Sequence, residues 1–246
     1  MHREYKRIVG GSDRAVLFIH GIVGTPNHFK NFLPLIPENF SVHNILLDGH
    51  GKGVKDFSKT SMKKWEAQIH TAVNALAEKH NEVFIVGHSL GSLLALEQAI
   101  KNPKVSKLFL LAVPLRLFIK PRMLINTLRI YFNKTEPEDA VLTAARNCYG
   151  IANDRNPFHY LGWIPRYLEL FSKIRRTRKE IELIKIPCEA YQSARDEMVS
   201  KKAKDILLRN PNISVMELEN AGHYYYPENE FALIKDGFIE FLGLER

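Results

Sequence analysis

The chain has 246 residues, of which 45% are hydrophobic, and its 35 lysines and arginines outnumber its 27 aspartates and glutamates to give a formal net charge of +8. This hydrophobic content is ordinary for a globular protein with a full core, and no apolar run approaches the ~18 residues that a membrane-spanning helix needs. The basic residues are mostly scattered, and the densest run, 175–179, contains no aromatic residue, so we expect a solvated basic surface and no nucleic-acid partner.

The cysteines and the N-terminal residues indicate the cellular compartment in which the protein is expected. The two cysteines, Cys148 and Cys188, lie far apart and lack the Cys-x-x-Cys spacing of a zinc site. We therefore expect small buried or half-buried thiols, no disulfide framework and no metal. No apolar segment follows the charged residues 1–7, so we expect no secretory signal and a cytoplasmic location.

Strands and helices alternate along most of the chain. Continuous apolar runs such as 14–19 are typical of strands buried on both faces, and apolar residues at helical spacing mark the helices between them. Residues 4–10 are a short leading strand or a tail. In chain order we expect strands at 14–19, 40–47, 83–86, 107–113, 188–192 and 213–218, and helices at 26–36, 61–80, 90–102, 199–209 and 228–242.

The central motif joins the third of these long strands to its helix. Residues 83–86 run into Gly87-His88-Ser89-Leu90-Gly91, and a helix-forming segment follows. This strand, turn and helix with serine at the apex is the pattern of a nucleophile elbow. Small residues at 87 and 91 are needed because side chains there would clash with the adjoining strand and helix. A glycine-rich turn of purely structural purpose is the alternative.

The alternation stops between residues 115 and 186. This stretch contains helical segments with broad apolar faces and no clean strand, so we interpret it as a helical cap inserted over the site. Residues 1–114 and 187–246 then form the two parts of one α/β core. The predicted fold is a mainly parallel central sheet flanked by helices, with ligands bound at the carboxyl ends of the strands.

A serine nucleophile needs a base and an orienting acid, which follow it in that order in this architecture. The acid candidate is Asp196, which lies just after the strand at 188–192; its neighbour Glu197 is the alternative. The base candidate is His223, which follows the last strand and precedes the last helix. A developing oxyanion needs two backbone donors, and we assign them to the N–H groups of Leu90 and Ile22.

These motifs together resemble the α/β-hydrolase superfamily, and within it the bacterial carboxylesterases and monoacylglycerol lipases. The resemblance covers about 10–113 and 187–242. It is carried by His20-Gly21-x-x-Gly24-Thr25-Pro26, Asp48-Gly49-His50-Gly51, Gly87-His88-Ser89-Leu90-Gly91, Asp196-x-x-Val199 and Ala221-Gly222-His223. It implies Ser89 as nucleophile, Asp196 as acid, His223 as base, Ile22 and Leu90 as oxyanion hole, and no cofactor.

Two positions depart from the family pattern. Ser92 stands where many relatives have a further glycine, and Ser193-Ala194-Arg195 replaces a segment in which a glycine often precedes the acid. The chemistry implied is hydrolysis of an apolar acyl ester through an acyl-enzyme. The same triad also serves thioester hydrolysis, acyl transfer, amide cleavage and carbon–carbon bond hydrolysis, and a noncatalytic binding protein is a third class.

One segment of the cap suggests a membrane-surface contact. Residues 120–134 are apolar with Lys120, Arg122, Arg129 and Lys134 among them, a composition that suits a lipid surface. The alternative is a cap helix that packs on the core and leaves its basic ends in water.

Overall fold

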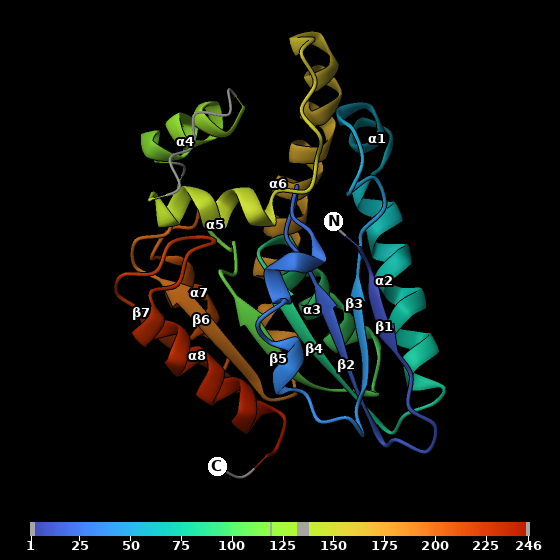
Figure 1. The fold of residues 1–246 in the computed structure, drawn as a ribbon. Helices are drawn as coiled ribbons and strands as arrows, with labels where there is room; N and C mark the ends of the chain where they lie inside the picture. Colours follow the sequence, from blue (N-terminus) through green and yellow to red (C-terminus); the bar gives the residue numbers. More distant parts are fainter. Residues whose placement is uncertain (1–2, 119, 132–137, 245–246) are drawn as a thin grey trace.

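The computed structural model describes residues 3–118, 120–131 and 138–244. Its centre is a seven-stranded sheet in the order β1-β3-β2-β4-β5-β6-β7 (Figure 1). The strands are β1 (Tyr5–Arg7), β2 (Arg14–Ile19), β3 (Ser41–Ile45), β4 (Glu82–His88), β5 (Val105–Leu111), β6 (Cys188–Ser193) and β7 (Ile213–Leu218). Only β1 runs antiparallel, against β3; the other neighbours pair in parallel, which confirms the predicted fold class.

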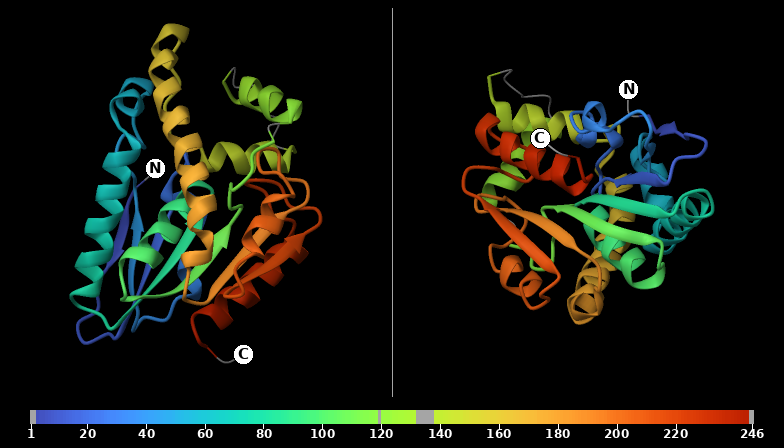
Figure 2. Two further views of the ribbon diagram at one scale, coloured as in Figure 1. Left: turned by 180° about the vertical axis from the view of Figure 1, so that it is seen from behind. Right: turned by 90° about the horizontal axis from the view of Figure 1, so that it is seen from below.

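Helices surround the sheet and extend beyond one of its edges. The α-helices are α1 (Val54–Lys59), α2 (Met62–Ala77), α3 (Leu90–Lys101), α4 (Pro121–Tyr131), α5 (Ala140–Cys148), α6 (Ile164–Glu180), α7 (Ala203–Leu207) and α8 (Glu228–Phe241). The 3₁₀ turns are η1 (Pro26–Phe29), η2 (Leu33–Leu35), η3 (Pro157–Trp163) and η4 (Ile181–Leu183). Figure 2 shows α8 on the face opposite to α3 and α6.

Alternate residues of β2 enter two separate hydrophobic clusters, because successive side chains of a strand point to opposite faces. Leu17 and Ile19 belong to the cluster shared with α2, α3 and α6, whereas Val16 and Phe18 belong to the cluster shared with η1 and α8. All four side chains are fully buried. The sheet is therefore covered on both faces, as its continuous apolar strands require.

Several predicted elements differ in extent. The helix expected over 26–36 is not a continuous α-helix but the two turns η1 and η2, since Pro34 inside it has no N–H and its ring clashes with the carbonyl four residues earlier. The helix expected over 199–209 is regular only at α7, and α1 was not predicted. By contrast, the helix expected over 61–80 is present as α2, and Ser61 caps it, because its side chain accepts a hydrogen bond from the N–H of Lys64.

The stretch 115–186 connects β5 to β6, which are neighbours in the sheet. Its first two helices, α4 and α5, lie beyond the carboxyl ends of the strands (Figure 1). Helix α6 contacts both the core and a cavity. Leu170 and Ile174 lie in the larger core cluster, and the first turns of the helix border the cavity described below. The boundaries of the cap at 115 and 186 stay a prediction, and α6 joins that unit to the core.

Candidate active site

Ser89 occupies the sharp turn between β4 and α3. Its φ of 52° and ψ of −118° lie outside the conformations that a residue with a Cβ normally adopts. Two backbone hydrogen bonds hold it there: its N–H donates to the carbonyl of Leu111, and its carbonyl accepts from the N–H of Ser92, both at 2.9 Å. A strain of this kind costs roughly 1–3 kcal/mol and persists only where the surroundings enforce it.

The surroundings of this turn leave no room for side chains at its glycines. A Cβ at Gly91 would lie 1.9 Å from the carbonyl oxygen of Ile19, and one at Gly87 would lie 2.8 Å from the backbone of Gly91. Ser92 fits at the position where the family pattern predicts glycine, because its hydroxyl lies 2.9 Å from the carbonyl of Gly87 and 3.2 Å from that of Leu111 and can donate to either. That departure from the family pattern therefore reinforces the turn.

His223 is held by two adjacent carboxylates. Its ring Nδ1 lies 2.8 Å from Oδ2 of Asp196, and its backbone N–H donates to Oε2 of Glu197 at 2.8 Å. Asp196 is fixed in turn, since its Oδ1 accepts from the backbone N–H groups of Met198 and Val199 at 2.7 and 2.8 Å. The structure thus assigns the ring contact to Asp196 and the backbone contact to Glu197.

The remaining contact of the expected triad, a hydrogen bond between His223 and Ser89, is not formed in the described structure. Nε2 of His223 is buried and has no hydrogen-bond partner within the described residues, so no bond joins it to Ser89. With the proton of Nδ1 donated to Asp196, Nε2 carries the lone pair of a base. Catalytic hydrogen bonds of this kind are often long without substrate and tighten when it binds.

The two predicted oxyanion donors belong to segments next to Ser89. The N–H of Leu90 is the first of α3 and has no partner inside that helix, and that of Ile22 donates to no acceptor in the described part of the chain. The loop containing Ile22 is close to the serine, because a Cβ at Gly21 would lie 3.1 Å from Cβ of Ser89.

Buried groups brace this loop. Nε2 of His20 accepts from the N–H of Leu47 at 3.0 Å, while its Nδ1 lies 2.9 Å from the carbonyl of Gly21. Gly150 connects the loop to the cap: its N–H donates to the carbonyl of Val23 at 2.8 Å. A Cβ at Gly150 would meet Cγ2 of Thr25 at 2.1 Å. The sequence contained no signal for this position, because its partners come from a distant loop.

A cavity of about 350 Å³ opens between the cap and the predicted site. We call it the substrate cavity. It is mainly apolar, and its lining contains Ile22 and His223 from the predicted site. The remaining lining residues are Val23, Met123, Thr127, Val141, Ala145, Tyr149, Asn153, Tyr160, Trp163, Tyr167, Glu197, Met198 and Tyr224.

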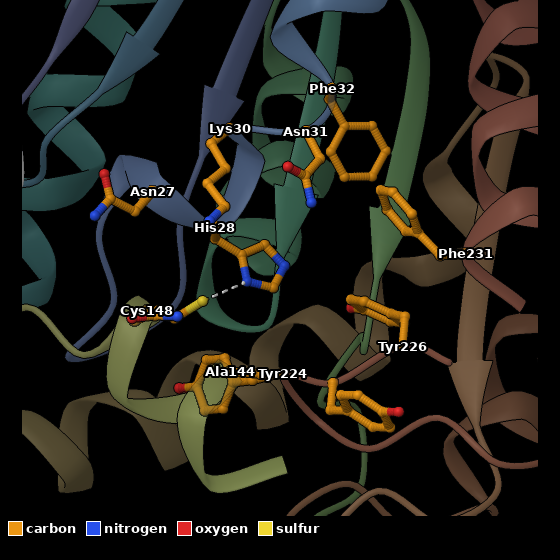
Figure 3. A pocket seen from close by; sticks show the side chains of 12 residues that line it. Asn27, His28, Lys30, Asn31, Phe32, Ala144, Cys148, Tyr224, Tyr226 and Phe231 are labelled. Carbon is orange, nitrogen blue, oxygen red and sulfur yellow. Dashed lines mark hydrogen bonds between the residues drawn. The ribbon is translucent and has the colours of Figure 1, made fainter. Parts of the chain in front are cut away.

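A second cavity, of about 320 Å³, lies on the other side of α5. Ala145 and Tyr149 face the substrate cavity, whereas Ala144 and Cys148 line the second one, so the helix and Tyr224 separate the two. Figure 3 shows His28 in this cavity, with its Nδ1 3.5 Å from the sulfur of Cys148. Burial raises the pKa of the Cys148 thiol to about 12, so this pair does not supply a thiolate nucleophile.

The histidines behind Ser89 are neutral. The rings of His28 and His88 are 3.8 Å apart, and Nε2 of His88 donates to the carbonyl of His223 at 2.9 Å. Burial, followed by the nearby His223, lowers the pKa of His28 to about 3, and burial also lowers that of His88 well below its usual value. They pack behind the site without adding positive charge.

Neither a metal cluster nor a membrane span is found in the described part of the chain. No group of three or more His, Cys, Asp or Glu residues there could hold a metal ion. No helix there is long and apolar enough to cross a membrane.

Comparisons with known proteins match most of the chain. Residues 16–234 match the model of the alpha/beta hydrolase family. The thermostable monoacylglycerol lipase of Bacillus sp. strain H-257 is 28% identical over 91 residues, which cover 37% of this chain and 36% of that enzyme. The matched segment thus spans about a third of that relative.

Solved structures share the architecture across nearly the whole chain. A structure from work on LipS and LipT, two metagenome-derived lipolytic enzymes, has a TM-score of 0.75 at 20% identity and covers 98% of this chain and 97% of that one. The monoacylglycerol lipase of Paleococcus ferrophilus has a TM-score of 0.69 at 18% identity, with 98% and 99% covered. At these identities the likeness shows the fold.

Proposed function

We propose that this chain, which belongs to the alpha/beta hydrolase family, is a serine carboxylic ester hydrolase acting on an apolar acyl ester. Ser89 is the nucleophile, His223 the base and Asp196 the acid that orients it. The observation that carries the proposal is the strained Ser89 at the strand–helix turn, together with a histidine whose ring is fixed by a buried aspartate and whose backbone carbonyl accepts from His88, the neighbour of Ser89. The similarity to a monoacylglycerol lipase supports the substrate class.

The proposed reaction proceeds in two stages. Nε2 of His223 takes the proton of Ser89 as its hydroxyl oxygen attacks the ester carbonyl, and the N–H groups of Ile22 and Leu90 stabilise the oxyanion. The imidazolium of His223 then protonates the departing alcohol, leaving an acyl-serine. Water attacks this ester with His223 again as base, which releases the carboxylic acid and restores the serine.

The lining of the substrate cavity supports an apolar acyl group. Val141 and Ala145 of α5 and Met123 of α4 supply aliphatic surface, and Trp163 and Tyr167 supply aromatic surface. A volume of about 350 Å³ is within the usual range for sites that bind small molecules.

Ester hydrolysis with Ser89→Ala as control tests the proposal. We expect purified protein to hydrolyse p-nitrophenyl esters between acetate and palmitate, and the chain length of fastest turnover to report the size of the cavity. The variant should lose at least about 10³-fold in kcat, because no other nucleophile replaces the hydroxyl. No turnover at any chain length, by protein shown to be folded, would contradict an esterase.

Other reactions use the same residues, so leaving-group preference separates them. Oxygen esters, thioesters and anilides of one acyl group distinguish esterase, thioesterase and amidase. Acyl transfer is recognised by product esters formed when an acceptor alcohol is added, and carbon–carbon hydrolysis by cleavage of a β-diketone. A noncatalytic binding protein would give no turnover with any of them.

We also propose that the cap makes a weak contact with a lipid surface. Exposed apolar side chains such as Phe118, Ile125 and Leu128 support it. Arg129 is paired with Asp139 at 3.0 Å, the side chain of Arg122 is not described and Lys134 lies outside the described residues. Exchanging Lys120, Arg122, Arg129 and Lys134 for glutamine should weaken binding to anionic vesicles in a sedimentation assay; unchanged binding would argue against lipid contact.

The proposed location is the cytoplasm. Cys148 and Cys188 are both buried free thiols, as the sequence predicted, and free thiols persist in a reducing compartment.

A further inference from the structure

The substrate cavity differs in charge from the molecule as a whole. The chain carries a net charge of +8, yet among the described residues those that line this cavity include one carboxylate, Glu197, and no lysine or arginine. The carboxylate of Asp196 is also close, because it binds the ring of His223, which lines the cavity. A bound molecule therefore meets negative charge in a pocket that is otherwise mostly apolar.

The charge of the Glu197 carboxylate is not balanced by an ion pair in the part that the structure describes. None of the ion pairs found there includes Glu197, and the one hydrogen bond that its carboxylate accepts is from the backbone N–H of His223 to Oε2, whereas its backbone carbonyl accepts from the N–H of Lys120 at 2.9 Å. The carboxylate oxygen Oε1 makes no hydrogen bond to a described residue. A carboxylate can accept about four hydrogen bonds, so capacity for a positively charged or donating ligand remains.

The position of Glu197 relates it to the alcohol half of an ester. His223 first takes the proton of Ser89 and then donates a proton to the leaving alcohol. The alcohol oxygen must therefore come within hydrogen-bond reach of His223. Glu197 is bonded to the backbone of that same histidine and borders the same cavity. The substituent of the alcohol, and not the far end of the acyl chain, is then the part of the substrate near the carboxylate.

Aromatic rings in the same cavity favour the same kind of ligand. Tyr160 and Trp163 lie with ring centroids 5.0 Å apart, and Tyr149, Tyr167 and Tyr224 complete the aromatic lining. Burial raises the pKa of Tyr167 to about 12 and raises that of Tyr149 further, so these phenols are neutral. Neutral aromatic faces attract organic cations, and quaternary ammonium groups are bound by such rings.

We propose that the alcohol of the ester carries a positive charge, of the quaternary-ammonium type found in choline, and that Glu197 is the residue that selects it. This inference rests on the proposed esterase function and goes beyond it by naming the alcohol. The apolar acyl group and the cationic alcohol then occupy different parts of one cavity. An ester whose alcohol bears a carboxylate is disfavoured by repulsion from Glu197.

The test compares two esters that differ in one atom. Butyrylcholine and 3,3-dimethylbutyl butyrate have the same shape, but the second has carbon in place of the charged nitrogen. We expect kcat/KM to be about tenfold higher for the cationic ester, because opposite charges attract strongly in a cavity of low dielectric constant. Glu197→Gln should lower this ratio about tenfold. The amide keeps an oxygen to accept the His223 N–H, and a ratio within one variant cancels any general loss of activity.

A surface variant controls for net charge. Glu182→Gln removes one negative charge at an exposed position and should leave the ratio as in the wild type. Equal kcat/KM for the two esters, or a ratio that Glu197→Gln does not change, would overturn the inference while the esterase function stands.

A binding measurement separates failure of this inference from failure of the proposed function. If folded protein hydrolyses no ester, choline and 3,3-dimethylbutanol are titrated as ligands while the fluorescence of Trp163 is followed in a Trp65→Phe background. Tighter binding of choline that weakens in Glu197→Gln supports cation selection without catalysis. Equal binding of the two alcohols overturns it.

Discussion

At the scale of single residues, two neighbouring carboxylates bind the same histidine in different ways. Asp196 accepts a hydrogen bond from the ring of His223 and Glu197 accepts one from its backbone. Only the ring contact can set the tautomer and stabilise an imidazolium. Sequence alone favoured Asp196 through the spacing to Val199, and the N–H of Val199 indeed donates to Asp196.

Exchanging each carboxylate for its amide tests this division. In Asp196→Asn, the side-chain oxygen can still accept from the N–H groups of Met198 and Val199, so the loop should stay folded. The amide nitrogen then faces Nδ1 of His223 and favours the wrong tautomer, and we expect kcat to fall by about 10³–10⁴-fold. Glu197→Gln should lose far less with a neutral ester. The assay is p-nitrophenyl ester hydrolysis, and a larger loss in Glu197→Gln would reverse the assignment.

At the scale of elements, a buried charge cluster fastens α6 to α3. The ammonium group of Lys173, with its side chain 1% exposed, bonds Glu97 of α3 and lies 2.8 Å from Glu66 of α2. Arg176 contacts both of those glutamates, so part of the basic run 175–179 is a structural clamp and not only a solvated surface. The clamp links the helix that borders the cavity to the helix that follows Ser89.

Replacing one charged residue of the cluster should destabilise the protein more than replacing two oppositely charged partners together. Lys173→Met leaves Glu97 buried with weaker compensation, and we expect a loss of about 3 kcal/mol in the free energy of unfolding. The double variant Lys173→Met, Glu97→Leu should recover most of that loss, because apolar side chains replace the buried charges. Urea denaturation followed by circular dichroism measures both. Equal midpoints for wild type and single variant would show that the cluster does not hold α6.

At the scale of the whole molecule, buried neutral histidines connect stability to pH. Burial lowers the pKa values of His20, His28, His50 and His88, to about 3 for His28 and about 4 for His50. The unfolded chain binds protons at these groups below about pH 6.5, whereas the folded chain does not until the pH is much lower. Protonation of the unfolded state therefore favours unfolding in mild acid.

We expect the free energy of unfolding to fall as the pH decreases from 7 to 5. Because the folded pKa of His50 is about 4, this residue alone accounts for about 2 kcal/mol at pH 5 relative to neutral pH. Glu97 acts at lower pH: burial raises its pKa, but hydrogen bonds from Lys101 and Lys173 outweigh this and lower it. The stability from Glu97 is present above about pH 4.3 and is lost as the pH falls further. Urea midpoints between pH 8 and 4 measure both effects, and a midpoint that is constant down to pH 5 would contradict neutral burial of the histidines.

Local sequence patterns determined the alternation of strands and helices, the turn at Ser89 and the family, because apolar periodicity and glycine spacing act over a few residues. They also placed Asp196 and His223 after successive strands, whose carboxyl ends meet at one edge of a parallel sheet. They did not reveal the cavity, since most of the aromatic rings that line it come from the cap, where a helical pattern does not show which face packs against which neighbour.

Only the tertiary structure decided what surrounds these residues. It brought Glu197 to the backbone of His223, Gly150 to the loop of Ile22 and Lys173 to Glu97. The partners in these contacts are 26 to 127 residues apart in the sequence, and no local motif marks them. The physical reason is that long-range contacts depend on how the layers pack, whereas a strand, a helix or a sharp turn is encoded within its own segment.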